Sequence, residues 1–372
     1  MSKCIRDNAR CSGCGVCRQV CPNGAISLRV DAKGFPRPAV GDNCIDCGLC
    51  VRHCHEHKRF DGYRVQKAFT AYSNDPGIRA VSSSGGMFTA LAVKVIEDGG
   101  FVCASGFDGD FVLRHRIVDT IEQLDGLRKS KYLESDMSSV WQELKQRVAS
   151  GRKGLFVGTP CQCSALRSFL GDKIDDIIVC DFICHGVASP LVFEKYKDYL
   201  KSKYGSPVKI EFRHKEKGEG SFFYYEGTDG SCMIPNYKES YPFAYASGLI
   251  IADDCTSCSY CKLERYGDIT LGDYVSGPTD YAKSTIFANT RKGSDILYQC
   301  RDITLQEEDL EDVVGKSWHL TAANTFNPDR QKVFDRLDLP WDLLEKRYFH
   351  PAGRLRLYKK ALINKLRSFL SR

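Results

Sequence analysis

Two copies of one cysteine spacing dominate the amino-terminal part of the chain. Residues 11–22 read CSGCGVCRQVCP and residues 44–55 read CIDCGLCVRHCH, so both follow C-x2-C-x2-C-x3-C. Three thiolates at this spacing bind one cubane [4Fe–4S] cluster, while the fourth cysteine of each run reaches the other cluster. The spacing therefore predicts two clusters within residues 1–60.

The crossed pairing assigns four cysteines to each cluster. The first set is Cys11, Cys14, Cys17 and Cys54, and the second is Cys44, Cys47, Cys50 and Cys21. Zinc is the alternative, but a run of four cysteines at this spacing is unusual for a closed tetrahedral site. Gly13, Gly15 and Gly48 allow the tight turns that direct backbone N–H groups at sulfur.

The other polar residues near these motifs are assigned no ligand role. We expect His53, His55 and His57 to be solvated loop residues, although His55 stands where the first copy has Pro22. Cys4 lies outside both motifs and is interpreted as a spare thiol.

Cysteine content and charge limit the class of protein. The chain has 19 cysteines in 372 residues, and its start lacks the apolar segment of a signal peptide. Many cysteines in a reducing compartment indicate metal or redox chemistry rather than disulfides, so a cytoplasmic protein is expected. The net charge of +6 lies largely in the last 30 residues, which argues against nucleic-acid binding.

Beyond residue 60 the pattern alternates between strands and helices. Strands are predicted at 101–107, 111–118, 154–158 and 175–182, helices at 87–96, 136–148, 161–170 and 190–204, and β structure at 207–234. Such alternation implies a parallel or mixed sheet. The expected fold class is α+β, with a bacterial-type 2[4Fe–4S] ferredoxin domain followed by an α/β body.

Two cysteines stand where a predicted strand ends. Cys161 lies in VGTPCQC (157–163) and Cys184 in CHG (184–186), while CTSCSYC (255–261) has cluster spacing but lacks a fourth cysteine nearby. Parallel strands deliver functional side chains to one sheet edge, so Cys161 and Cys184 are candidates to complete that site. Packing, or a nucleophile with His185 as its base, remains the alternative for Cys161.

A loop of small residues precedes the helix predicted at 87–96. Residues 82–86 read SSSGG, and such a loop exposes backbone N–H groups at the positive end of the helix dipole. It would suit a phosphate group, and an ordinary connecting loop is the alternative.

Taken in order, these motifs resemble the family of coenzyme F420 hydrogenase/dehydrogenase beta subunits. The matching segments are SSGG (83–86), KSKY (129–132), GTPCQ (158–162), CHG with a following SP (184–190), SCSYC to DITLGD (257–273) and STIFANTRKG (284–293). The resemblance covers residues 1–335. The expected domains are a ferredoxin domain (1–60), the family's N-terminal region with a flavin loop (65–150), its C-terminal region (151–335) and a basic amphipathic tail (336–372).

The resemblance implies a flavin-binding oxidoreductase body with FAD and a third [4Fe–4S] cluster. The implied ligands of this body cluster are Cys161, Cys184, Cys258 and Cys261. Cys255 is then an extra thiol or a substitute ligand, and local spacing alone would choose it.

The implied flavin contacts come from several of the matching segments. They are Ser83, Ser84, Gly85, Gly86, Thr89, Lys131, Thr159 and Gln162. A solvated lysine is the alternative for Lys131, and structural capping is the alternative for Asp268 and Asp273. No catalytic acid or base is predicted, because the flavin supplies the hydride chemistry.

The implied function is electron transfer between a hydride-carrying, F420-like cofactor or substrate and [4Fe–4S] clusters through FAD. The alternatives are a flavin-free electron-transfer subunit of a larger complex and an F420-independent reductase of a pigment or polysaccharide-pathway intermediate. The expected partner is a redox protein or a small hydride donor or acceptor. Arg213, His214, Lys215 and Lys217 would meet an acidic cofactor tail, or form an exposed loop.

The carboxyl-terminal segment has an apolar helical face among basic residues. It reads RLRLYKKALINKLRSFLSR over 354–372. Such a helix can lie on a membrane surface, dock a partner or pack on its own domain.

Overall fold

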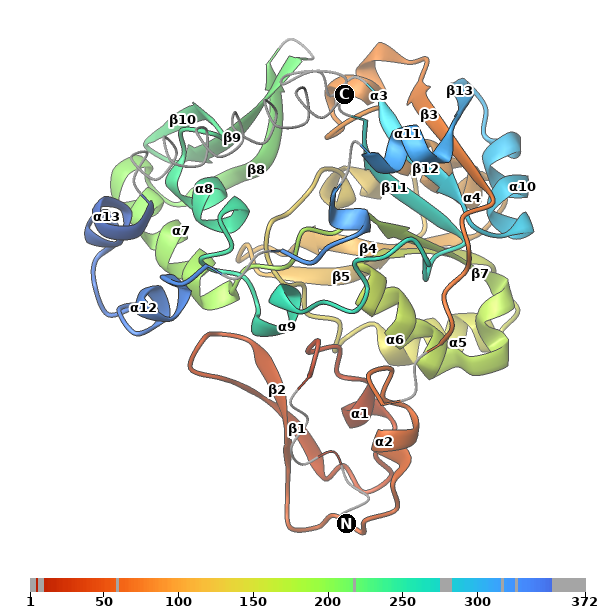
Figure 1. The fold of residues 1–372 in the computed structure, drawn as a ribbon, viewed down its shortest axis with the longest axis horizontal. Helices are drawn as coiled ribbons and strands as arrows, with labels where there is room; N and C mark the ends of the chain where they lie inside the picture. Colours follow the sequence, from red (N-terminus) through yellow and green to blue (C-terminus); the bar gives the residue numbers. More distant parts are fainter. Residues whose placement is uncertain are drawn as a thin grey trace, which may run out of the picture.

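The computed structural model describes residue 5 and residues 10–57, 60–216, 219–274, 283–315, 318–324 and 327–349. Cys4, Lys217 and the basic segment 354–372 lie outside the described residues. Figure 1 shows a small amino-terminal domain below a larger body.

The amino-terminal domain combines one hairpin with two short helices. The hairpin pairs β1 (Ile26–Val30) with β2 (Pro36–Val40), and the helices are α1 (Val16–Gln19) and α2 (Leu49–Arg52). Each helix follows a glycine in the left-handed region, Gly15 at φ 75° and Gly48 at φ 73°. A side chain would strain both turns. The turns place the third cysteine of each motif at the start of its helix, in the buried centre of the domain.

The body is organised around one eight-stranded mixed sheet. In spatial order its strands are β13 (Ile303–Glu308), β3 (Lys67–Ser73), β12 (Ser284–Ala288), β11 (Ile269–Asp273), β7 (Ile177–Phe182), β6 (Gly154–Gly158), β4 (Phe101–Phe107) and β5 (Leu113–Val118). The four strands from β11 to β4 are parallel, and the pairs at both edges are antiparallel. The expected mixed sheet is therefore present.

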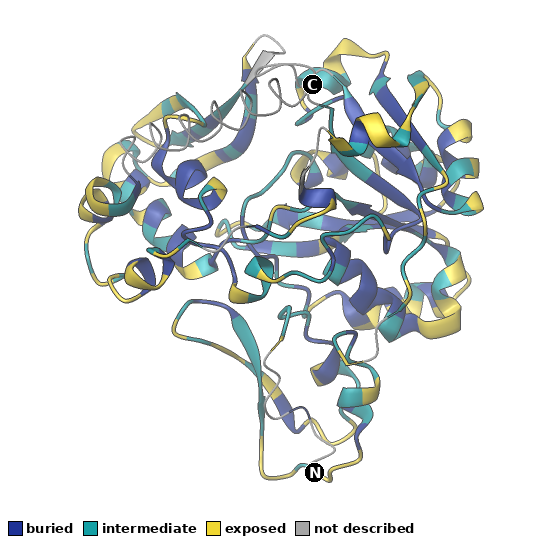
Figure 2. Cartoon of the chain, in the orientation of Figure 1, coloured by how far each residue is buried: buried dark blue, intermediate teal, exposed yellow. Residues whose placement is uncertain are grey.

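Helices cover both faces of this sheet. The packing of apolar side chains places α4 (Met87–Glu97) and α10 (Arg291–Gln299) on one face, and α5 (Trp141–Ala149) and α6 (Pro160–Leu170) on the other. Neighbouring residues of one strand face opposite sides, so Leu155 packs on the first face and Phe156 on the second. Figure 2 shows buried residues along the central strands.

The predicted helix 136–148 begins later than expected, at Trp141. Asp136 forms a bridge with Arg114 of β5, and its carboxylate accepts a hydrogen bond from the Arg114 guanidinium at 2.6 Å. This pairing holds the main chain of Asp136 at the sheet edge, outside the helix.

Short elements connect these layers. They are α3 (Pro76–Ala80), η1 (Glu122–Leu127), η2 (Gly171–Asp176), α9 (Asp253–Thr256), α11 (Leu310–Gly315) and η3 (Trp318–Leu320).

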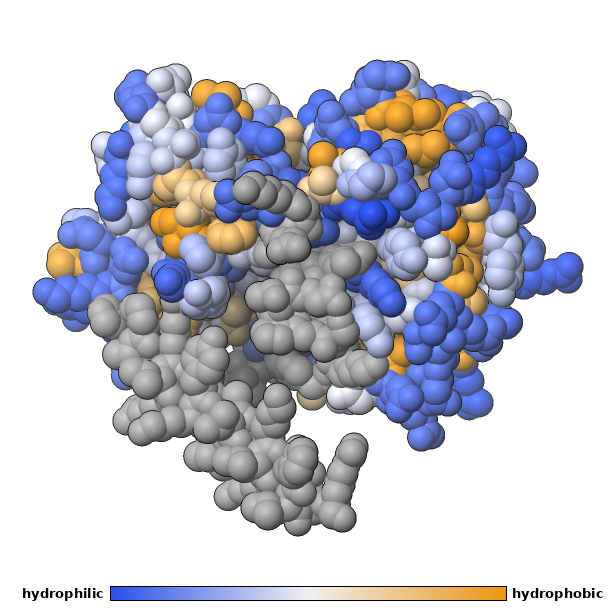
Figure 3. Space-filling model, turned by 90° about the horizontal axis from the view of Figure 1, so that it is seen from above, coloured by the Kyte–Doolittle hydropathy of each residue, from blue (hydrophilic) through white to orange (hydrophobic). Residues whose placement is uncertain are grey.

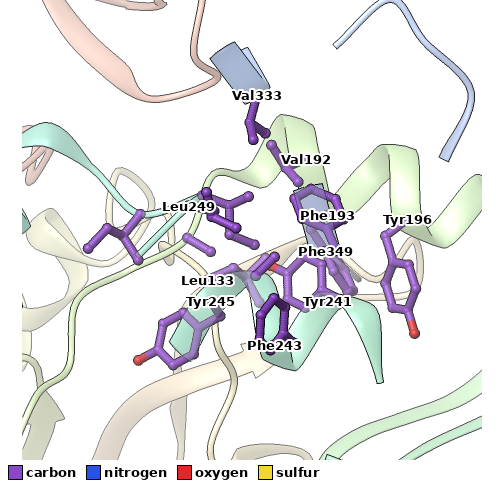
Figure 4. Packing of buried hydrophobic residues seen from close by; sticks show 14 of the residues in the cluster. Leu133, Val192, Phe193, Tyr196, Tyr241, Phe243, Tyr245, Leu249, Val333 and Phe349 are labelled. Carbon is purple, nitrogen blue, oxygen red and sulfur yellow. The ribbon is translucent and has the colours of Figure 1, made fainter. Parts of the chain in front are cut away.

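A second lobe of the body has its own aromatic core. Its antiparallel sheet contains β8 (Pro207–Glu216), β9 (Glu219–Gly227) and β10 (Gly230–Pro235), and its helices are α7 (Pro190–Tyr204), α8 (Ser240–Ala246), α12 (Arg330–Phe334), α13 (Trp341–Leu344) and η4 (Glu345–Phe349). Figure 4 shows Phe193, Tyr241 and Phe349 within this core. The region expected as a tail from residue 336 thus differs over 341–349, because its aromatic side chains pack in the lobe.

Hydrogen bonds hold the amino-terminal domain on the body at several places, including the hairpin tip and the short helices. At the hairpin tip, Ser189 Oγ donates to Lys33 O at 2.5 Å, and a side chain on Gly34 would meet that same hydroxyl. Near the helices, Trp141 Nε1 donates to Cys14 O at 2.8 Å. The domain is therefore held in one orientation on the body.

Candidate functional site

The structure brings the cysteines of each predicted ferredoxin set together. One set lines a cavity of about 320 Å³: Cys21, Cys44, Cys47 and Cys50. The other set, Cys11, Cys14, Cys17 and Cys54, lies close enough for one thiolate to raise the pKa of another. Burial is the larger cause, and it raises the pKa of Cys17 to about 12. A coordinating metal would offset this cost, because it deprotonates a thiol outright.

A larger cavity, of about 830 Å³, lies where the amino-terminal domain meets the body. Six cysteines line it: Cys161, Cys184, Cys255, Cys258 and Cys261 from the body, and Cys11 from the ferredoxin domain. Among the described residues, no three His, Cys, Asp or Glu side chains are grouped as the ligands of one ion. The sulfurs line one shared space instead.

The helix cap at the end of β6 positions Cys161. Thr159 caps α6 and Pro160 begins it, while Gln162 Oε1 accepts from Thr159 N at 3.0 Å. Thr159 Oγ1 lies 3.0 Å from Cys161 Sγ. The predicted flavin contacts Thr159 and Gln162 therefore form a capping box, and Thr159 lines the cysteine cavity rather than the loop at 83–86.

Cys184 follows β7, the strand that neighbours β6 in parallel. Gly186 N donates to Cys184 Sγ at 3.4 Å. The carboxyl ends of parallel strands meet at one sheet edge, which explains why Cys161 and Cys184 share the cavity.

A buried ion pair fixes residues 265–267, which follow the cysteine group CTSCSYC (255–261). Arg265 Nη2 lies 3.1 Å from Asp181 Oδ1, and both side chains are almost fully buried. Asp181 Oδ2 also accepts from the backbone of Tyr266 at 2.9 Å and of Gly267 at 3.0 Å. Asp268 accepts from Val179 N at 2.8 Å, so its role is structural.

His55 differs from its prediction as a solvated residue. It is 1% exposed, and its ring bridges Tyr260 Oη at 2.5 Å and Ser12 Oγ at 2.9 Å. Tyr260 lies between Cys258 and Cys261, so His55 connects the loops of two cysteine groups. The one sequence signal for this role is the departure from Pro22 of the first copy. His57 is exposed, and His53 bonds to Ser168 O at 3.1 Å.

Glu134 is a cavity residue that the sequence analysis missed. Its side chain is buried, and its carboxylate lies so close to Gly13 that a Cβ on Gly13 would clash with it. Burial raises the pKa of Glu134 to about 8. Among the described residues, Glu134 Oε2 has no hydrogen-bond partner. No motif marks this glutamate in the sequence.

The loop at 83–86 is fixed on the sheet beside β3 and β12. Ser83 Oγ accepts from Ser130 N at 2.8 Å, and Ser84 Oγ lies 3.0 Å from Ser284 Oγ. A side chain on Gly85 would lie 2.5 Å from Ala71 O, and Gly86 begins α4 at φ 89°. Both glycines are required by this close approach and turn.

Two of the predicted flavin contacts, Lys131 and Thr89, form hydrogen bonds within the protein. Lys131 Nζ donates to three backbone carbonyls, of Ser105, Leu127 and Arg128, at 2.7–3.0 Å. Thr89 is buried and accepts from Arg128 Nε at 3.2 Å. In these hydrogen bonds, neither Lys131 nor Thr89 donates to the loop at 83–86.

Two buried cations of β8 lie over this loop. Arg213 Nη2 donates to Ser83 O at 3.1 Å, and Lys215 Nζ donates to Ser84 O at 2.9 Å. Asp273 pairs with Arg213 at 2.8 Å. Burial, and then the charge of Arg213, lowers the pKa of Lys215 to about 8. Lys215 Nζ also donates to Arg79 O at 3.1 Å, so both cations are hydrogen-bonded to the main chain of this region.

His185 is part of the wall of the cysteine cavity. It follows Cys184, lines the cavity and stacks on His319 with ring centroids 3.6 Å apart. The His185 side chain itself is exposed.

Comparisons with known proteins agree with this arrangement. Two family models describe the beta subunit of coenzyme F420 hydrogenase/dehydrogenase; the N-terminal model matches residues 68–142 and the C-terminal model matches 151–313. Together they match more than half of the chain. The chain belongs to the family of coenzyme F420 hydrogenase/dehydrogenase beta subunits. A 4Fe–4S dicluster domain model matches residues 10–58, so the chain is an iron–sulfur oxidoreductase of this family.

Individual relatives are distant. One of the subunits of F(420)H(2) dehydrogenase from Methanosarcina mazei is 24% identical over 331 residues, which cover 82% of this chain and 87% of the relative. Coenzyme F420-dependent sulfite reductase of Methanocaldococcus jannaschii is 25% identical, and the match spans 78% of this chain but 46% of that protein. A chain of the F420-reducing [NiFe] hydrogenase complex from Methanosarcina barkeri matches with TM-score 0.49 and 19% identity, over 74% of this chain and 93% of that chain.

Within the described part of the chain, none of the helices has the length and hydropathy needed to cross a membrane. The face seen in Figure 3 carries mainly hydrophilic side chains with small hydrophobic areas between them.

Proposed function

We propose that the chain passes electrons between a hydride-carrying, F420-like cofactor or substrate and [4Fe–4S] clusters through FAD. Both curated relatives carry F420 in their names, which supports this choice of partner molecule. One observation carries the proposal: the cavity of the body cysteines is also lined by Cys11, a predicted ligand of the first ferredoxin cluster.

Hydrogen bonds link the first ferredoxin site to the residues that line the body cavity. Cys11 N donates to Asp254 Oδ2 at 3.3 Å, and Asp254 precedes Cys255 in the chain. Arg37 Nη1 donates to Cys11 O at 2.8 Å. These bonds fix the first ferredoxin site against the body cavity. A fixed, short separation is what electron transfer between the two sites requires.

The residues present fit a third cluster in the body. Five body cysteines open into one cavity, and a cubane takes four thiolates. Cys161, Cys184, Cys258 and Cys261 are the set that family resemblance implies, and burial raises the pKa of Cys184 to about 12. Iron would supply the positive charge that these buried thiolates lack.

The loop at 83–86 fits an anionic part of FAD. Its small residues lie under the buried cations Arg213 and Lys215, which would bind the pyrophosphate, or the acidic tail of an F420-like molecule. When bound, FAD exchanges a hydride for single electrons, and [4Fe–4S] clusters carry electrons one at a time.

A flavin-free electron-transfer subunit is the second candidate. One observation favours it: the side chains of Lys131, Thr159 and Gln162 form hydrogen bonds with other groups of the protein. These bonds remove three of the expected flavin contacts. In that case a partner subunit would bind the hydride carrier.

Metal and flavin analysis separates these functions. The protein is purified without oxygen, and iron and acid-extractable flavin are measured per chain. We expect about 12 iron atoms, for three cubane clusters, and one FAD. Reduced F420 and NADH are then compared as donors, with cluster reduction followed by electron paramagnetic resonance.

A matched pair of variants locates the third cluster. Cys161→Ala should lower the iron content from about 12 to about 8 atoms. Cys163→Ala should leave it unchanged, because Cys163 lies in the same helix but its Sγ faces Gly158 O and Cys180 O in the core. About 8 iron atoms in the wild-type protein would reject the body cluster, and about 12 without flavin would favour the second candidate.

A further inference from the structure

A strained turn supports the loop at 83–86. Lys129 has φ +68°, in the left-handed region that a residue with a long side chain rarely adopts. The next residue, Ser130, donates to Ser83 Oγ from its N–H at 2.8 Å and from its hydroxyl at 3.2 Å. Such strain persists only where neighbouring contacts hold it, and it gathers at functional sites. The contacts of Lys129 therefore decide how firmly Ser83 is held.

The main sheet fixes the backbone on one side of Lys129. Lys131 Nζ donates to Leu127 O at 2.8 Å and to Arg128 O at 2.7 Å, directly before the strained residue. The same ammonium donates to Ser105 O, in β4, at 3.0 Å. These bonds restrain residues 127 and 128, and a second contact is made by the side chain of Lys129 itself.

The second lobe supplies that contact. Lys129 Nζ lies 2.6 Å from Glu211 Oε2 of β8, and each side chain is 12% exposed. Burial acts to raise the pKa of Glu211, but the hydrogen bonds from Lys129 and His214 outweigh it and lower the pKa to about 2. Glu211 is therefore a carboxylate at neutral pH, and its loss would leave a nearly buried ammonium without this partner.

The lobe also holds the far end of the turn. Tyr241 Oη donates to Tyr132 O at 3.0 Å, and the Tyr132 ring stacks on Tyr245 with ring centroids 4.6 Å apart. Tyr241 and Tyr245 belong to the aromatic core of the lobe. Residues 129–132 are thus bound by the lobe at both ends, while Ser130 between them holds the loop at 83–86.

We propose that Glu211 is a positioning residue for FAD: it acts through Lys129 to hold the turn that fixes Ser83. The inference rests on the proposed function, because it presumes that FAD binds at the loop at 83–86. Without the Glu211 carboxylate, Lys129 relaxes from its positive φ, and both hydrogen bonds from Ser130 to Ser83 are weakened. The lobe, which lies far from the loop in the sequence, thereby takes part in cofactor binding.

FAD titration of full-chain variants tests this role. Each protein is purified without oxygen and depleted of flavin, and the dissociation constant for FAD is measured from the quenching of flavin fluorescence. Glu211→Gln keeps the shape of the side chain and removes its charge. We expect it to raise this constant about tenfold, since the competent turn is then populated about a tenth of the time. The control is Glu194→Gln, which removes an ion pair with Lys197 (2.8 Å) within α7 of the same lobe and should bind FAD like the wild-type protein.

The substitution Lys129→Gly separates positioning from a general structural role. Glycine adopts positive φ without strain, so the double variant Glu211→Gln with Lys129→Gly should regain wild-type affinity although the ion pair is still absent. Thermal unfolding followed by tryptophan fluorescence reports whether the lobe has folded, because Trp341 packs in its core. If Glu211→Gln does not fold, Lys129→Met removes the same ion pair and should show the same rise.

Two results overturn the inference while leaving the proposed function intact. One is unchanged affinity in Glu211→Gln, or in Lys129→Met where that variant takes its place, and the other is no recovery in the double variant. A wild-type protein that binds no FAD would instead reject the proposed function, and this inference with it.

Discussion

Replacing Asp181 by alanine should loosen the proposed body cluster without changing any cysteine. Asp181 is fully buried at the end of β7, and it accepts hydrogen bonds from Arg265, Thr270 and the backbone of Tyr266 and Gly267. Residues 265–267 follow Cys261 closely. Asp181→Ala therefore leaves a buried guanidinium without its carboxylate and frees the segment that carries the cysteines.

The expected cost is large. Removing one partner of a buried ion pair costs about 3–5 kcal/mol. With about 1.4 kcal/mol for each tenfold change, local opening of this segment should become roughly one hundred to several thousand times more frequent. Such opening would expose the proposed body cluster before the ferredoxin clusters.

Anaerobic release of iron to a colorimetric chelator measures this opening. In Asp181→Ala about a third of the iron should leave fast, and the rest at the wild-type rate. The control is Asp98→Ala, which removes a surface pair with Lys94 (2.6 Å, Asp98 54% exposed) worth less than about 1 kcal/mol. The reasoning fails if Asp181→Ala releases iron like the control, or if two thirds of the iron leaves first.

Three further predictions concern pH, the domain junction and the flavin loop. Burial lowers the pKa of His115 from 6.5 to about 4, so below pH 6.5 the unfolded chain takes up a proton that the folded chain refuses. Stability should fall by about 1.4 kcal/mol per pH unit between pH 6.5 and 4, and His115→Gln should flatten this decline in thermal midpoints. His55→Pro should speed proteolytic release of the ferredoxin domain, because the bonds to Tyr260 and Ser12 are lost, whereas the exposed His57→Ala should not. Gly85→Ala should lower FAD content at constant iron, since its Cβ would lie 2.5 Å from Ala71 O; Gly109→Ala, with open space around it, is the control, and equal flavin in both would contradict the assignment.

Features that depend on spacing along the chain were predictable. The cysteine runs, the breaks at Cys161 and Cys184, and the strands at 101–107 and 154–158 all follow from local patterns, and the structure contains both strands with those bounds. Parallel strand ends meet at one edge, so pattern made Cys161 and Cys184 candidates for one site, whereas their joint role as ligands was implied only by the family resemblance.

Features that depend on contacts between distant segments were not predictable. His55 lies in a polar stretch that predicts a solvated side chain, yet it is buried, and its ring forms a hydrogen bond with Tyr260 Oη, 205 residues away in the sequence. Lys131 lies in a family motif, yet three carbonyls surround its ammonium. In both cases the sequence shows the polar group but contains no local signal for the partner.

The hairpin tip of the amino-terminal domain has a consequence for protein engineering. Lys33 bonds to Asp253, and Gly34 fits against Ser189 only because it has no side chain. A dicluster domain transplanted from another protein would carry its own cysteines. To lie correctly on the body it would also need a glycine at the position of Gly34 and a hairpin long enough to contact Ser189 and Asp253. Chimaeras that exchange residues 1–60 should therefore be designed around the hairpin tip as well as around the cysteines.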